Sequence, residues 1–186
     1  MSRPDPVIML DPGHGGRDPG AVNDNGTPVK TDDTLEKTIN LEAALTMKHY
    51  LSQRGVGVRM TRYSDIYPSL TARTSRATAT PTIKLFVSIH HDSPHVTRPG
   101  VYYSDHPESR ILAQQVAVAM AENAWVRSHK TSRFGRLYIN DFKRGPSILL
   151  ELGPTAPVSR EQRIHRVSVA LVPLLAYLNP DRTVRA

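Results

Sequence analysis

The sequence predicts a single α/β domain with a largely parallel sheet. Short apolar runs that suit buried strands alternate along the chain with longer segments that repeat apolar residues at helical spacing. The length of 186 residues suits one domain with a core of its own. Because no internal repeat, low-complexity segment or linker divides the sequence, we expect residues 1–186 to form one domain.

Five short apolar runs predict the strands. The clearest is residues 83–89 (IKLFVSI), which are rich in β-branched and aromatic side chains. The others are residues 7–11 (VIMLD), 56–61 (VGVRMT), 101–104 (VYYS) and 148–151 (ILLE). Residues 12–33, rich in Gly, Pro, Asp and Asn, follow the first run, and a loop of about 20 residues inside a compact domain is usually functional.

Four longer segments predict helices. They are residues 35–54, 69–80, 108–124 and about 159–178. Gly55 is a typical C-terminal stop for the first of these helices, and Pro81 prevents the second from continuing. The last one opens with Ser159 and Gln162, which can form a capping box.

The chain is strongly basic, with a net charge of +7 and a pI of about 9.9. A basic surface attracts anionic polymers, such as nucleic acid, acidic wall polymers or phosphorylated lipid head groups, although it can also serve solubility alone. Between residues 127 and 144, positive side chains greatly outnumber the one acid, Asp141. They are Arg127, Lys130, Arg133, Arg136, Lys143 and Arg144.

Several classes of protein and of site are excluded by composition. There is no cysteine, so disulfides and thiolate metal sites are excluded and any zinc must be held by His, Asp or Glu. No window approaches the ~20 consecutive apolar residues of a membrane span. The first ten residues, MSRPDPVIML, lack the apolar stretch of a secretory signal, so we expect either a trimmed signal or another route of export.

Three polar side chains lie at or just after the carboxyl ends of predicted strands. His14 comes after VIMLD, His90 follows IKLFVSI directly, and Glu151 closes ILLE. In open α/β sheets ligands bind outside the carboxyl ends of the strands. Parallel strands would therefore bring these three side chains to one edge of the sheet.

Two imidazoles and one carboxylate are sufficient for a hydrolytic zinc site. Zinc accepts two His and one Glu, keeps its fourth position open for water, and lowers the pKa of that water to about 7. A second carboxylate that does not bind the metal would accept the proton of the water and pass it to the leaving amine. The sequence offers candidates for each of these roles.

Each candidate also has a structural interpretation. The DPGHGG segment around His14 could be a tight turn or a phosphate-binding loop, and Glu36, three residues after Asp33, could form part of a helix cap. His90 and the adjacent His91 would point in opposite directions if the strand continues through them, so at most one should face a metal.

Glu151 likewise has an alternative. At the end of a strand it could form an ion pair with Arg144 or Lys143 instead of taking part in chemistry.

Four motifs, in order, resemble those of the type 3 N-acetylmuramoyl-L-alanine amidase family. VIMLDPGHGGRDPGA resembles the opening motif of the family, and LEKTINL its Glu-Lys-x-x-Asn-Leu helix start. LTARTSRA followed by LFVSIHHD resembles its Arg-containing helix and Ser-Ile-His strand, and SILLELG the segment with its catalytic Glu. Together they extend from residue 7 to residue 153, which is most of the chain.

The resemblance implies a mostly parallel, twisted sheet flanked by helices, and one zinc ion per chain. By position it implies that His14, Glu36 and His90 are the zinc ligands and that Glu151 is catalytic. The family cuts the amide between N-acetylmuramic acid and L-alanine in peptidoglycan. It usually has Ala-Asn where this chain has His91-Asp92, which leaves substrate contacts open, and Phe where this chain has Pro154.

Other functional interpretations remain open at this point. A peptidase that cuts within the stem peptide would use the same metal chemistry, and a basic binding protein could carry the motifs as vestiges. Ten residues lie between His90 and Val101, too few for the regulatory helix that blocks some bacterial division amidases, so we expect an uninhibited enzyme.

The setting follows from the same features. A basic, compact domain without a visible signal resembles a phage endolysin, although a bacterial amidase whose signal has been removed would look similar. We expect a monomer that acts on peptidoglycan at the cell wall or in the periplasm, with Arg127, Lys130 and Arg133 as candidate contacts to anionic wall polymers. We do not expect nucleic acid to be a partner.

Overall fold

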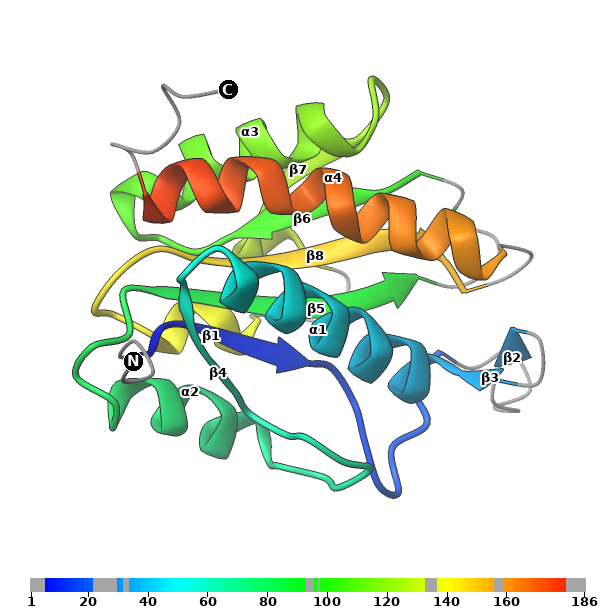
Figure 1. The fold of residues 1–186 in the computed structure, drawn as a ribbon, viewed down its shortest axis with the longest axis horizontal. Coiled ribbons are helices and arrows are strands. Elements are labelled where there is room, and N and C mark those ends of the chain that lie inside the picture. Colours follow the sequence, from blue (N-terminus) through cyan, green and yellow to red (C-terminus); the bar gives the residue numbers. More distant parts are fainter. Residues whose placement is uncertain are drawn as a thin grey trace.

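The computed structural model describes residues 6–21, 30–31, 34–92, 96, 98–132, 137–155 and 159–179. Within these residues a six-stranded sheet runs through the molecule in the order β4-β1-β5-β8-β6-β7 (Figure 1). Its strands are β1 (Pro6–Pro12), β4 (Gly57–Met60), β5 (Leu85–Asp92), β6 (Gly100–Tyr103), β7 (Trp125–Ser128) and β8 (Ser147–Pro154). Two short strands, β2 (Lys30–Thr31) and β3 (Thr34–Leu35), form a separate antiparallel pair.

The sheet is mostly parallel, as the sequence predicts. β1 pairs in parallel with both β4 and β5, and β5 pairs in parallel with β8. Leu10 lies beside Val87 in this register, and Val87 beside Ile148. The exception is β6, which runs antiparallel to β8 while β7 runs parallel to β6. The carboxyl ends of β1, β5 and β8 therefore meet at one edge of the sheet (Figure 1).

Helices cover both faces of the sheet. The helices are α1 (Glu36–Gln53), α2 (Leu70–Thr78), α3 (Pro107–Met120) and α4 (Arg160–Leu178), with 3₁₀ turns η1 (His129–Thr131) and η2 (Tyr138–Asp141). Buried residues of α1, α3 and α4 pack with Leu10 and Val87 on one face, where α1 and α4 lie side by side (Figure 1). Ala77 of α2 and Ile139 of η2 pack with Phe86 on the other face.

The predicted signals at Gly55 and at Ser159 are confirmed, and Ser69 provides a further cap. Gly55 follows α1 with a positive φ of 78°, which glycine adopts readily. The Ser69 side chain accepts a hydrogen bond from the amide of Ala72 at the start of α2. Ser159 and Gln162 form the predicted reciprocal capping box of α4.

The third helix and the segment after it differ from the sequence prediction, as does the short pair β2 and β3, which the sequence did not indicate. The third helix ends at Met120 rather than at residue 124, and Trp125 begins a strand, β7, that the pattern did not indicate. The Trp125 ring lies against Tyr102, with ring centroids 4.8 Å apart, and also covers Gly100, where any side chain would collide with it. Pairing with β6 therefore decides the structure of a segment whose local propensity favours helix.

No helix in the described part of the chain is both long enough and apolar enough to cross a bilayer.

Candidate metal centre

The candidate site begins in a tight turn that follows β1. His14 has a φ of 60°, a left-handed conformation that is uncommon for residues other than glycine, and the next two residues, Gly15 and Gly16, also have positive φ. The amide of Gly13 donates to the carbonyl of Ile89 on β5 (2.9 Å), and Gly15 and Asp18 exchange backbone hydrogen bonds. The turn is thereby held against the end of β5.

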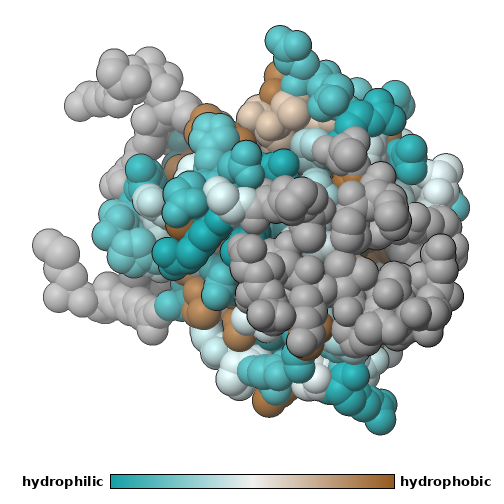
Figure 2. Space-filling model, turned by 90° about the vertical axis from the view of Figure 1, so that its right-hand side faces the viewer, coloured by the Kyte–Doolittle hydropathy of each residue, from teal (hydrophilic) through white to brown (hydrophobic). Residues whose placement is uncertain are grey.

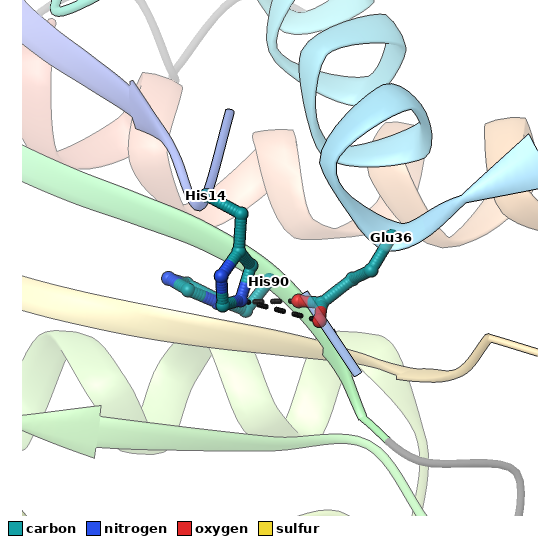
Figure 3. Close-up of side chains that lie close together, drawn as sticks. All are labelled: His14, Glu36 and His90. Carbon is teal, nitrogen blue, oxygen red and sulfur yellow. Dashed lines mark hydrogen bonds and ion pairs between the residues drawn. The ribbon is translucent and has the colours of Figure 1, made fainter. Parts of the chain in front are cut away.

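Three predicted side chains converge at this edge of the sheet. His14 comes from the turn after β1, Glu36 is the first residue of α1, and His90 lies near the end of β5 (Figure 3). Glu36 Oε2 lies 3.2 Å from His14 Nε2, and Glu36 Oε1 lies 3.2 Å from His90 Nδ1. Ligand atoms of the three residues all lie within 4.8 Å of one another, so the group could hold a metal ion.

Further hydrogen bonds orient His14 and Glu36. The second ring nitrogen of His14, Nδ1, donates to Asp18 Oδ2 (2.9 Å). Glu36 accepts hydrogen bonds from the amide of Ala21 (2.6 Å), from Asn40 Nδ2 (3.0 Å) and from the amide of His91 (3.2 Å). Such contacts behind the ligand atoms fix ring and carboxylate orientation in metal sites.

Glycines allow the close approach of the candidate ligands. A side chain at Gly13 would lie 2.2 Å from the His90 ring, and one at Gly20 would lie 2.4 Å from Glu36 Oε2. Since neither ring nor carboxylate could stay in place beside such a side chain, both glycines are required by the geometry of the cluster.

The electrostatics favour an ionised carboxylate between two imidazoles. Burial opposes the charge of Glu36, but hydrogen bonds and attraction from His14 and His90 outweigh it and keep the Glu36 pKa well below its ordinary value. Burial lowers the pKa of His90. Burial also disfavours charge on His14, but its bonds to Asp18 and Glu36 prevail and raise the His14 pKa to about 10. A bound cation would compete with the proton that His14 carries.

The two adjacent histidines point in opposite directions, as predicted. The His90 ring faces Glu36, whereas His91 Nδ1 donates to Asn40 Oδ1 on α1 (2.8 Å). Burial, with Arg163 and Arg166 nearby, lowers the pKa of His91 to about 3, so its ring is neutral. The Asn40 amide thus links the His91 ring to the Glu36 carboxylate.

Glu151 lies beside this cluster. It is the register partner of His90 on the parallel strand β8, so the two side chains project from the same face of the sheet. Only 9% of Glu151 is exposed. Arg144, proposed from the sequence as an ion-pair partner, lies before the opposite end of β8, where its guanidinium donates to the carbonyl of Thr80 (2.9 Å).

Glu36 does not act as the N-terminal cap of its helix. The cap residue is Leu35, which makes no side-chain capping bond, and the Glu36 carboxylate turns toward the two histidines instead. Asp33, the proposed other half of a cap, lies outside the described residues.

The residues that support the candidate ligands could not be assigned this role from the sequence. Asp18 and Asn40 both lie in motifs that resemble those of the family, and an acid four positions after His14 is a signal for a partner of its ring. Arg73 lies in the LTARTSRA motif, but neither that motif nor the sequence around Arg62 indicates that the two guanidinium groups are buried against the His14 turn, because an arginine in a sequence is usually exposed.

The described part of the surface around this edge is mostly polar. Figure 2 views the side of the molecule where the parallel strands end, and hydrophilic side chains predominate among the described residues seen there. In the basic segment, the Arg127 guanidinium lies 4.7 Å from the centre of the Trp125 ring, and Lys130 Nζ lies 2.9 Å from a carboxylate oxygen of Asp105. Arg133 and Arg136 fall outside the described residues.

Known proteins resemble this chain in sequence and in fold. The chain is similar to the probable cell wall amidase LytH of Staphylococcus epidermidis, with 36% identity over 170 residues that cover 86% of this chain and 53% of that protein. LytH of Staphylococcus aureus is 32% identical over 167 residues, with the same coverage. The chain therefore spans about half the length of these curated relatives.

Solved structures share the fold over nearly the whole chain. N-acetylmuramoyl-L-alanine amidase AmiC2 of Nostoc punctiforme superposes with a TM-score of 0.71 at 27% identity, covering 94% of this chain and 97% of that one. The N-acetylmuramoyl-L-alanine amidase from Clostridium difficile 630 has a TM-score of 0.76 at 23% identity, covering 97% and 100%, and at that identity the likeness concerns the fold alone.

The family model described as N-acetylmuramoyl-L-alanine amidase matches residues 8–166, a segment that runs from β1 into α4 and includes the whole candidate site. With that match over most of its length, the chain belongs to the N-acetylmuramoyl-L-alanine amidase family.

Proposed function

We propose that this chain is a zinc-dependent amidase that cleaves the bond between N-acetylmuramic acid and L-alanine in peptidoglycan. The observation that carries the proposal is the convergence of His14, Glu36 and His90, with their ligand atoms within 4.8 Å of one another, in a chain of this family. Glu151 on the adjacent strand supplies the second carboxylate that amide hydrolysis requires. Since one chain contributes all four residues, the proposal requires no second copy and is compatible with a monomer.

The donor set suits one zinc ion per chain. Two imidazoles and one carboxylate are the ligands of known hydrolytic zinc sites, which leave a further position for water or substrate. Asp18 behind His14 and Asn40 behind Glu36 are the contacts expected behind such ligands. In the described part of the chain, this is the one group of His and acidic residues close enough to hold a metal.

The roles of the side chains in hydrolysis follow from their positions. Bound zinc would supply polarisation of the scissile carbonyl and a lower pKa for water. Glu151 then accepts the proton of the attacking water and delivers it to the nitrogen of the departing L-alanine. His14 and Glu36 are held in position by the contacts behind them, and Glu151 is the side chain that carries the proton.

Product analysis tests the reaction directly. Incubation of purified peptidoglycan with the protein and zinc should release stem peptides whose new amino terminus is L-alanine, which labelling of free amines followed by mass spectrometry detects. New amines between amino acids of the stem would instead show the peptidase alternative. Binding to walls without any new amine would show the third alternative, a binding protein.

We further propose that no helix between β5 and β6 restrains the enzyme. β5 ends at Asp92 and β6 begins at Gly100, so residues 93–99 make the whole connection. Seven residues would form only about two helical turns, and none would remain to connect such a helix to β5 and β6. An enzyme of this kind would act on the wall without a separate activation step, as a phage endolysin or as a bacterial wall amidase.

The basic segment supports a proposal about wall binding. We predict that replacing Arg127, Lys130 and Arg133 together with glutamine weakens binding to purified walls at low salt and lowers lysis of cells, because positive charge concentrates the enzyme on an anionic polymer. Raising the salt should weaken wild-type binding in the same way, since exposed charges are screened beyond about 8 Å at physiological ionic strength. Cosedimentation with walls measures the effect.

The control is a triple variant with the same change of net charge. Arg54, Lys84 and Arg110 are exposed and lie in other parts of the chain, and their replacement with glutamine should leave wall binding close to that of the wild type. Hydrolysis of a small soluble muramyl peptide should be unchanged in both variants. Equal wall binding by wild type and the Arg127 variant at low salt would contradict the proposal and favour internal pairing of these cations.

A further inference from the structure

We propose that Arg62 and Arg73 are positioning residues for the candidate zinc ligand His14. Their buried guanidinium groups hold the backbone of the turn at Pro12, Gly13 and His14 (the ligand turn) in its ligating conformation before any metal binds. The inference rests on the proposed function in that it takes zinc as the ion that this turn serves.

Three consecutive carbonyl groups of the ligand turn accept hydrogen bonds from these arginines. The Pro12 carbonyl accepts from Arg62 Nε (3.0 Å) and from a terminal nitrogen of Arg73 (2.8 Å). Arg62 also donates to the carbonyl of Gly13 (2.8 Å), and Arg73 to the carbonyl of His14 (2.8 Å). A guanidinium group is planar and presents several donors in fixed directions, so it can set the direction of neighbouring carbonyls.

The ligand turn requires such support. His14 has a left-handed φ of 60°, which persists in residues other than glycine only where the surroundings determine it. Buried carbonyl groups also need donors, and the turn lies at the end of β1, where sheet pairing stops providing them. The two arginines satisfy the carbonyls and hold the strained conformation at the same time.

Arg62 also connects the two ligand-bearing segments. The same terminal nitrogen that bonds to Gly13 donates to the carbonyl of Lys37 (2.7 Å). Gly13 precedes His14 and Lys37 follows Glu36, so one guanidinium group spans the backbone beside both candidate ligands. The separation of His14 from Glu36 is therefore set by a contact that requires no metal.

The burial of these charges supports a specific positioning role. Arg62 is 1% exposed and Arg73 is 2% exposed. Arg73 has a buried ion-pair partner, Asp11 (2.8 Å), but among the described residues no carboxylate lies within ion-pair distance of Arg62, which is bound by carbonyl groups. Burying a cation without a paired anion is costly, which favours a specific structural purpose at this position.

Lysine substitutions test the proposal while keeping the charge. In Arg62→Lys and Arg73→Lys the ammonium group cannot reproduce the fork of donors, so the ligand turn should lose its fixed geometry. We expect zinc affinity, measured by competition with a chromogenic chelator, to fall by roughly 10- to 100-fold in each variant, as for other contacts behind metal ligands. The visible spectrum of the Co²⁺-substituted protein should change too, because it reports ligand geometry.

Arg59→Lys is the matched control. Arg59 lies three residues before Arg62, and its guanidinium donates to the side chain of Thr80 (3.1 Å) rather than to the ligand turn. Its zinc affinity and Co²⁺ spectrum should equal those of the wild type. Unchanged zinc affinity in folded Arg62→Lys and Arg73→Lys variants would overturn the proposal.

Wild-type protein provides a test that does not depend on the folding of variants. The amide of Gly13, in the ligand turn, donates to the carbonyl of Ile89, and the amides of Gly15 and Asp18, just after the turn, donate to each other's carbonyls. We expect these amides to be protected from hydrogen exchange equally with and without zinc. Protection that appears only after zinc is added would show that the metal, and not the arginines, orders the turn.

The two proposals can fail separately. A protein that binds zinc but releases no L-alanine amine would refute the proposed reaction, while chelator competition would still decide the role of the arginines. If wild-type protein bound no zinc at all, the proposed function would fail, and exchange at the ligand turn would still show whether it is preformed.

Discussion

Replacing His14 or His90 with alanine is expected to abolish both zinc retention and amide hydrolysis. Each histidine supplies one of three candidate ligands, and the remaining imidazole and carboxylate would hold the ion too weakly to survive purification. Metal analysis after purification without added zinc should find one zinc per wild-type chain and almost none in either variant. The same samples should release no new amines from peptidoglycan.

His49→Ala is the control for this pair of substitutions. His49 is exposed near the end of α1, away from the cluster, so its loss should change neither zinc content nor activity. Loss of zinc from His49→Ala would identify His49 as a further ligand. If His90→Ala retained stoichiometric zinc while His91→Ala lost it, the ligand would be His91 and the assignment of His90 would be wrong.

Glu151→Gln is expected to retain zinc and lose most of its turnover. The amide keeps the size of the side chain but cannot accept the proton of the attacking water, and general base catalysis typically contributes about 10²- to 10⁴-fold. We therefore expect kcat to fall by roughly that factor, with one zinc per chain and unchanged thermal unfolding. Initial rates on a soluble muramyl peptide, with metal analysis of the same preparation, measure both quantities.

Glu122→Gln makes the same chemical change at an exposed position between α3 and β7, and it should behave as wild type. A zinc-loaded Glu151→Gln protein that retained most of its activity would remove Glu151 from the reaction. Loss of zinc from this variant would instead make Glu151 a ligand.

The location of the candidate site could be predicted because it depends on local patterns. Apolar runs ending near His14, His90 and Glu151 indicate strands, and parallel strands bring their carboxyl ends to one edge. Alternation along β5 likewise predicts that only one of His90 and His91 faces this edge. These inferences require only that side chains alternate between the two faces of a strand and that the strands run parallel.

Features that depend on distant partners could not be predicted. Residues 121–124 (AENA) belong to the segment predicted to be helical, yet α3 stops at Met120 because Trp125 pairs into the sheet beside Gly100. The reversed direction of β6 also follows from how the chain returns to β8, which periodicity does not encode. Arg73 lies in a helix whose pattern does not reveal that its guanidinium crosses to Asp11 and the ligand turn.

The sequence by itself determined the class of the fold, the order of most elements and the side chains available for zinc chemistry, because hydrophobic period, capping residues and strand ends are local properties. Only the tertiary structure decided how His14, Glu36 and His90 meet and what holds them there. Their approach depends on glycines that leave room for a ring and a carboxylate, and on buried arginines that bind backbone carbonyls nearly fifty or more residues away. Such contacts arise from packing in three dimensions, where a single side chain satisfies groups that no sequence pattern places side by side.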